Sequence, residues 1–281
     1  MNRATVVRPC EIVDSVTHLA YDRAGPVGDI PILLVHASVA DRRMWDGVWE
    51  PLVERRDAVR IDLRGFGGST DRPSGELAPH QDVLDVLDDE GIERAHVIGA
   101  SFGAGVAVEV GLTERARVAS LLLVAPGGSL IPEMTGQLRA FAVAENTAMD
   151  AGDLDTAVEA NLATWVDGPG QPADRVAPEV RARVGTMQRL AFELTADWDD
   201  VEEAELDPPA LDRLTEVGVP TLVLTGTLDV DAIDQAATAV LTGVTGARQV
   251  VWPDTAHLPS MERPDAFVTL LLDWVAEVEE S

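Results

Sequence analysis

The pentapeptide Gly99-Ala100-Ser101-Phe102-Gly103 constrains this chain more than any other feature. It follows a short strand-like run, residues 96–98, and precedes an Ala- and Val-rich segment, residues 104–112, so the local order is strand, tight turn, helix. A serine at the apex of such a turn has strained backbone geometry, and glycine two positions away avoids collision with the adjoining strand and helix. The hydroxyl then projects free of the sheet, at the positive end of the helix. This pattern is typical of a nucleophile elbow, with Ser101 as the nucleophile.

A serine nucleophile needs a general base, and the chain contains five histidines. His257 lies in a loop between the apolar run 249–252 and a C-terminal helix, and it is the candidate base. Position assigns the other four elsewhere: His18 to an N-terminal strand-like run, His80 to the start of an acidic helix, His96 to the far end of the elbow strand and His36 to the end of another strand.

The base in turn needs a carboxylate to orient it. Residues 220–226 indicate a buried parallel strand, entered through proline and left through glycine, and Asp229 follows at its carboxyl end. The strand after the elbow helix, residues 121–124, leads into Ala-Pro-Gly-Gly and offers no acid at that alternative place. We therefore predict Asp229 as the orienting acid. The nearby rivals are Asp231 and Asp234, which suit the start of the next helix, and Asp254.

These residues, in this order along the chain, resemble a serine-type α/β-hydrolase, and the resemblance covers nearly all of the sequence. The strand at residues 32–35 ends in His36-Ala37-Ser38, which is similar to the family's H-G-x segment, with alanine where glycine is usual. The resemblance implies an oxyanion hole formed by the backbone N–H groups of Ser38 and Phe102. It implies a structural role for His36.

A second segment that carries the resemblance is the turn at residues 62–69. Its sequence, Asp-Leu-Arg-Gly-Phe-Gly-Gly-Ser, is similar to the family's D-x-R-G-x-G-x-S turn. We interpret this turn as structural, with Asp62 and Arg64 bracing the loops and not contacting substrate.

Alternating strand-like and helical runs predict an α/β fold: a mostly parallel sheet with helices on both faces. A chain of 281 residues suits one such core carrying an insertion. We assign the core to residues 1–126 and 211–281 and the insertion to residues 127–210. Strands are expected near 32–37, 57–62, 96–100, 120–125, 220–226 and 247–252, after an N-terminal strand pair at about 6–21, with helices near 41–54, 78–90, 102–114, 231–242 and 264–278.

The insertion at residues 127–210 shows three apolar stripes at helical spacing, which predict three helices. A helical cap over the carboxyl ends of the strands would cover Ser101 and shape a substrate pocket. Such a cap is expected to set substrate choice without taking part in the chemical step. The residues expected to line the pocket are Trp45, Met134, Leu138, Trp165 and Met187.

Composition excludes several other functions. The formal net charge is −28, and every basic residue is arginine, so binding to the phosphate backbone of a nucleic acid is not expected. Residues 1–30 carry no apolar core of a leader and no stretch is long enough to span a membrane, so a cytoplasmic protein without membrane association is expected. The single cysteine, Cys10, excludes an internal disulfide, and no metal- or nucleotide-binding motif is present, so no metal and no cofactor are expected.

The combined features predict a hydrolase that cleaves a carboxylic ester or lactone of a small, mainly apolar molecule by acyl transfer. The same residues also serve carbon–carbon bond hydrolases, thioesterases and cofactor-free haloperoxidases, and some relatives with intact triads only bind small molecules. A serine at the elbow argues against haloalkane dehalogenases and epoxide hydrolases, which use aspartate there. The sequence leaves open the substrate, the oligomeric state and whether the acidic surface reflects salt adaptation or coding bias.

Overall fold

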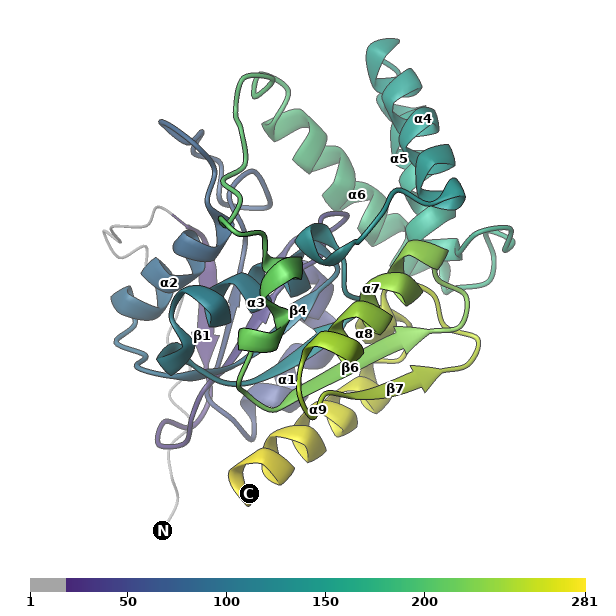
Figure 1. The fold of residues 1–281 in the computed structure, drawn as a ribbon. Coiled ribbons are helices and arrows are strands. Elements are labelled where there is room, and N and C mark those ends of the chain that lie inside the picture. Colours follow the sequence, from purple (N-terminus) through teal and green to yellow (C-terminus); the bar gives the residue numbers. More distant parts are fainter. Residues whose placement is uncertain (1–18) are drawn as a thin grey trace.

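The computed structural model of the chain, which describes residues 19–281, contains one seven-stranded sheet with the order β1-β3-β2-β4-β5-β6-β7 (Figure 1). Strand β1 pairs antiparallel with β3, and all the other pairings are parallel. The predicted α/β class with a mostly parallel sheet is therefore confirmed. The strands are β1 (Tyr21–Ala24), β2 (Ile32–Val35), β3 (Ala58–Ile61), β4 (Ala95–Ala100), β5 (Val118–Val124), β6 (Thr221–Gly226) and β7 (Arg248–Trp252).

The central strands are apolar runs because both faces of a parallel sheet are covered. Every residue of β2, β4, β5 and β6 is buried. Alternate side chains enter two separate clusters: Leu34 and Leu122 point into one, while Leu33 and Leu123 point into the other. Each face therefore needs its own layer of helices.

Helices cover both faces of the sheet, as the sequence predicts (Figure 1). Helices α1 (Asp46–Val53) and α9 (Pro264–Glu279) contribute their apolar sides to the first cluster, including Trp49, Phe267 and Leu271. Helices α2 (Pro79–Asp89), α3 (Phe102–Thr113) and α7 (Asp231–Gly243) contribute theirs to the second. The remaining short helices are η1 (Arg42–Trp45), η2 (Arg115–Arg117), η3 (Gly128–Leu130), η5 (Ala210–Glu216) and α8 (Pro259–Glu262).

The chain between β5 and β6 is helical. It forms α4 (Gly136–Asp150), α5 (Leu154–Asn161), the π-helical turn η4 (Leu162–Asp167) and α6 (Pro178–Leu194). Side-chain caps define two of the starts: Thr135 accepts from the Leu138 N–H, and Asp153 accepts from the Thr156 N–H. Figure 1 shows these helices grouped at one end of the molecule, far from the C-terminus.

The strand pair predicted at about 6–21 falls mainly on residues 1–18, which lie outside the described residues together with Cys10 and His18. From residue 19 onward, no helix combines the length and the apolar character that crossing a bilayer requires.

Candidate active site

Ser101 occupies the turn between β4 and α3 with positive φ, at 53°, and ψ of −118°. The surrounding backbone explains why glycine flanks it. A Cβ atom on Gly99 would lie 2.1 Å from the carbonyl oxygen of Gly103, at the start of α3. A Cβ atom on Gly103 would lie 2.5 Å from the carbonyl oxygen of His36, just beyond β2. Glycine at these two positions therefore allows the backbone to approach closely on both sides of the strained serine turn.

Ser101, His257 and Asp229, which are far apart in the sequence, meet in one hydrogen-bonded chain. The distance from Ser101 Oγ to His257 Nε2 is 2.7 Å. On the other side of the ring, His257 Nδ1 lies 2.8 Å from Asp229 Oδ2 and 3.0 Å from Oδ1. With the Nδ1 proton donated to the carboxylate, Nε2 carries the free lone pair and accepts the Ser101 hydroxyl proton. This is the geometry that a serine needs to become a nucleophile.

Asp229 is the acid that reaches the imidazole. It follows β6 in the turn before α7, its carboxylate is almost fully buried, and Oδ1 also accepts the Val230 N–H at 2.7 Å. The rivals lie elsewhere: Asp231 accepts a hydrogen bond from the Thr135 hydroxyl at 2.5 Å, and Asp254 sits in the turn after β7 with φ of 54°. Burial, together with Asp229 and Asp231 nearby, raises the pKa of Asp234.

The two amides expected to form an oxyanion hole belong to residues at the same end of the sheet. Phe102 is the first residue of α3, so its N–H has no acceptor within the helix. Ser38 is an exposed residue in the otherwise buried loop after β2, and the close approach of Gly103 to the His36 carbonyl brings this loop to the start of α3. The loop after β5 also packs here, because the Gly127 N–H donates to the Ser101 carbonyl at 3.0 Å.

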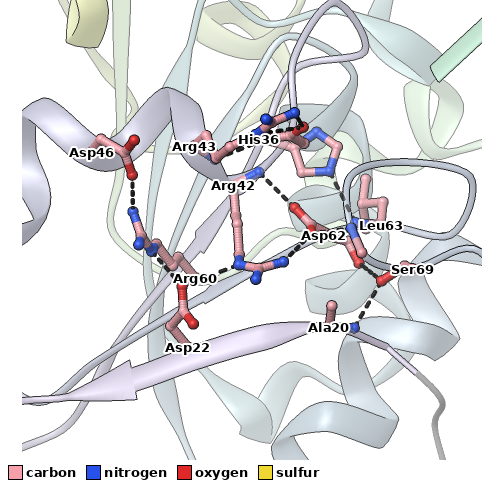
Figure 2. A network of polar contacts seen from close by, with 12 residues as sticks. Ala20, Asp22, His36, Arg42, Arg43, Asp46, Arg60, Asp62, Leu63 and Ser69 are labelled. Carbon is pink, nitrogen blue, oxygen red and sulfur yellow. Dashed lines mark hydrogen bonds and ion pairs between the residues drawn. The ribbon is translucent and has the colours of Figure 1, made fainter. Parts of the chain in front are cut away.

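His36 holds the loop that carries Ser38. Its Nδ1 lies 2.8 Å from the Ala37 carbonyl oxygen, and its Nε2 accepts the Leu63 N–H at 2.9 Å (Figure 2). An imidazole that donates at one nitrogen and accepts at the other is neutral, and burial lowers its pKa accordingly. The ring also packs edge-on against Phe66, 4.9 Å between centroids. His36 thus joins the loop after β2 to the turn after β3.

Asp62 braces the same two segments from the side. Its carboxylate accepts the N–H groups of Arg42 and Gly68, both at 2.7 Å, and pairs with the Arg42 guanidinium (Figure 2). Arg64 points away from this network and pairs with Asp82 of α2 at 2.5 Å. These contacts are those of loop bracing, the role expected of Asp62 and Arg64 from the sequence.

Of the residues predicted to line the pocket, Trp165 packs directly against His257. It lies in η4, and its indole ring is 4.5 Å from the His257 ring, measured between centroids. Phe141 of α4 packs edge-on against the indole at 5.1 Å. Phe141 is not among the residues predicted to line the pocket. Its place in the apolar stripe of α4 is the sequence feature that could have indicated it. Trp165 therefore borders the imidazole, and Phe141 packs against Trp165.

The other predicted pocket residues lie in different surroundings. Trp45 is completely buried and packs on Phe267, 5.8 Å between ring centroids, and Met187 is almost completely buried in the same cluster. In this conformation neither offers surface to a bound molecule. Met134 is half exposed just before α4, and Leu138 is partly buried against the cluster that contains Trp165. Within residues 19–281, no group of three or more His, Cys, Asp or Glu side chains is arranged to hold a metal ion.

Comparisons with known proteins agree with this architecture. The model of the alpha/beta hydrolase family matches residues 32–270. A 3-oxoadipate enol-lactonase from Acinetobacter baylyi is 25% identical over 261 residues, covering 91% of this chain and 92% of the relative. A pimeloyl-[acyl-carrier protein] methyl ester esterase from Nitrosospira multiformis is 27% identical over 256 residues, covering 84% of this chain and 91% of the relative.

Among solved structures, the enol-lactonase from Burkholderia xenovorans LB400 superposes with a TM-score of 0.70 at 23% identity, covering 92% of this chain and 96% of that one. A likeness at this identity shows the fold. The family model, which spans most of the chain, shows more: the protein belongs to the alpha/beta hydrolase family.

Proposed function

We propose that the protein is a serine hydrolase that cleaves carboxylic esters or lactones of small, mainly apolar molecules. The observation that carries this proposal is the hydrogen-bonded chain from Ser101 through His257 to Asp229. Hydrolase activity is supported by family membership, and the names of the relatives include an enol-lactonase and a methyl ester esterase.

The first half of the proposed reaction is acyl transfer to the serine. Ser101 Oγ attacks the substrate carbonyl carbon while its proton passes to His257 Nε2, 2.7 Å away. The Asp229 carboxylate stabilises the imidazolium that forms. The oxyanion accepts hydrogen bonds from the N–H groups of Ser38 and Phe102. Removing one such fixed donor lowers the rate by about 10²–10³-fold. The tetrahedral intermediate collapses as the leaving alkoxide takes the proton from His257.

The second half regenerates the enzyme. His257 takes a proton from water, and the resulting hydroxide attacks the acyl carbon of the Ser101 ester. The intermediate collapses when Ser101 Oγ leaves with the proton from His257, which releases the carboxylic acid. Ester or lactone plus water thus gives acid plus alcohol, or a hydroxy acid. Because His257 and the Asp229 carboxylate are buried, the imidazole keeps one orientation: Nδ1 stays bonded to the carboxylate while Nε2 takes up and releases the transferred proton.

We assign substrate choice to residues 127–210, which we treat as a cap on a core formed by residues 1–126 and 211–281. Trp165 and Phe141 supply the aromatic surface next to the imidazole, and Leu138 is the third apolar candidate. Aromatic and aliphatic walls favour an apolar acyl or alcohol group beside the scissile bond.

Two assays test this proposal. The purified protein should hydrolyse p-nitrophenyl acetate, with activity unaffected by EDTA. Phenylmethanesulfonyl fluoride should inactivate it, and peptide mass spectrometry should find the added group on Ser101. Ser101→Ala should abolish labelling and lower turnover by about 10⁴-fold or more. Absence of both turnover and labelling in folded wild-type protein would refute the proposal and favour a binding protein.

A further inference from the structure

Arg175, in the loop between η4 and α6, binds three separate segments of the chain. Its guanidinium donates to the Asp167 carbonyl oxygen at 2.5 Å and to the Val166 carbonyl oxygen at 2.6 Å, so it caps the C-terminal end of η4. It also donates to the Asp254 carbonyl oxygen at 3.3 Å and pairs with Glu262 of α8 at 2.5 Å. A planar group with five donors suits such a convergence, and Lys offers no equivalent geometry.

Two of these contacts lead directly to His257. The second carboxylate oxygen of Glu262 accepts the Ala256 N–H at 2.9 Å, and Ala256 precedes the histidine. Asp254 lies three residues before it, in the turn with positive φ. Arg175 and Glu262 therefore hold the backbone of residues 254–256 at two points, the Asp254 carbonyl and the Ala256 N–H. Both side chains are mostly buried, at 12% and 7% exposure, so this ion pair is shielded from water.

The end of η4 also contacts the triad at His257 and the loop that carries Asp229. Trp165, one residue before the carbonyl groups that Arg175 caps, packs on the His257 ring. Gly168 follows η4 with φ of 92°, and a Cβ atom there would lie 2.5 Å from the Leu228 carbonyl oxygen, next to Asp229. The end of η4 is thus seated against the loops that carry both the base and the acid.

We propose that Arg175 is a positioning residue for His257. By joining the end of η4 to the 254–256 backbone through Glu262, it fixes the imidazole relative to Ser101 and to the indole of Trp165. The inference rests on the proposed function of the triad. It goes further, because it gives residues 127–210 a part in the chemical step as well as in substrate choice.

The test compares Arg175→Met with Arg181→Met. Arg181 is the matched control because it also pairs with Asp167 at the end of η4, through the carboxylate, and its other partner is Glu159 of α5, away from residues 254–257. Each variant is assayed for kcat and KM on p-nitrophenyl acetate and for the rate of sulfonylation by phenylmethanesulfonyl fluoride. Both probes are small, so they report the triad more than the apolar walls.

We expect Arg175→Met to lower kcat and the sulfonylation rate together by about 10- to 100-fold, with KM little changed, since small misplacements of a catalytic group are this costly. Arg175→Lys should recover part of the loss, and Arg181→Met should stay close to wild type. Circular dichroism and thermal unfolding verify the fold. A folded Arg175→Met with wild-type kcat and labelling, or with only KM raised, overturns the inference.

A second variant covers the case in which Arg175→Met does not fold because Glu262 is left as an unpaired buried charge. The double variant Arg175→Met/Glu262→Gln removes both charges, and the amide oxygen of glutamine can still accept the Ala256 N–H. Slowed sulfonylation in this variant supports the inference, and a wild-type rate overturns it. Failure of wild-type protein to react with the reagent would instead overturn the proposed serine chemistry.

Discussion

The indole ring of Trp165 lies against the imidazole ring of His257, with 4.5 Å between the ring centroids and 46° between the ring planes. The two rings come from different parts of the chain, one from η4 and the other from the loop after β7. Phe141 packs edge-on against the same indole. In the proposed mechanism, an acyl group on Ser101 would lie near this indole.

We expect Trp165→Ala to change the preference among p-nitrophenyl esters of different acyl length. Removing the indole opens space beside the imidazole, so longer acyl chains should gain relative to acetate in kcat/KM. A hydrophobic contact of this kind is worth about 10- to 200-fold in selectivity at most. Val143→Ala, on the exposed side of α4, is the control and should leave the preference unchanged. An unaltered preference in Trp165→Ala would remove this residue from the substrate site.

We expect Asp229→Asn to lower kcat by about 10⁴-fold, because an amide favours the imidazole tautomer that cannot accept the Ser101 proton. The buried carboxylate bonds His257 Nδ1 at 2.8 Å, whereas Asp231 accepts from the Thr135 hydroxyl instead. Asp231→Asn and Asp254→Asn serve as matched controls and should retain most of the activity. If either of these caused the larger loss in kcat, the orienting acid would be misassigned.

We expect Gly103→Ala to destabilise the fold by about 3 kcal/mol, at the upper end of overpacking costs. The new Cβ atom would lie 2.5 Å from the backbone carbonyl oxygen of His36, which cannot move without shifting β2. Gly136→Ala at the start of α4 is the control, because no atom lies within 4 Å of the added Cβ. Urea unfolding measures both. Equal stability of the two variants would contradict the close approach at the elbow.

The core strands and the elbow were predictable from the sequence because their signals are local. A buried parallel strand such as β5 is a run of apolar residues, and Gly99, Ser101 and Gly103 follow from the steric needs of one turn. Asp229 and His257 were predictable because each follows a recognisable strand at its carboxyl end. The six strands predicted from residue 32 onward and the helices on both faces are confirmed by the structure.

The remainder depends on contacts between distant segments, which leave no local pattern. Trp45 and Trp165 are both tryptophans predicted to line the pocket, yet one packs on Phe267 in the interior and the other on His257. Arg175 follows a Pro- and Gly-containing loop that has no periodicity, so nothing in its neighbourhood indicates that it bonds Glu262. Only the packing of η4 against the loops after β6 and β7 reveals these roles.

We expect added salt to stabilise the protein. The chain carries 49 acidic and 21 basic residues, for a net charge of −28, and this excess repels itself more in the compact state than in the unfolded chain. Raising NaCl to about 1 M shortens the screening length to about 3 Å and removes most of that repulsion. The thermal midpoint should rise by several degrees. A falling midpoint would show that the surface ion pairs stabilise the fold more than the repulsion destabilises it.

Glu203 gives the fold a pH dependence of defined sign. It lies in the segment after α6, which pairs with the chain before α2 through the bridge between Leu77 and Glu203. Glu203 is exposed at the surface, yet the neighbouring chain desolvates its carboxyl group, and this, followed by repulsion from Glu109 and Glu205, raises its pKa to about 7, while His80 acts in the opposite direction. In the unfolded chain the pKa of a glutamate is about 4.3.

Because the folded state holds the Glu203 proton more tightly, this residue costs stability as pH rises from about 4.3 to about 7, and the cost is complete above that. We therefore expect Glu203→Gln to raise the thermal midpoint at pH 8 and to leave it nearly unchanged at pH 4. The difference between the two proteins should shrink at high salt, which screens Glu109 and Glu205. A variant that is less stable than wild type at pH 8 would mean that the ionised carboxylate has a favourable partner there.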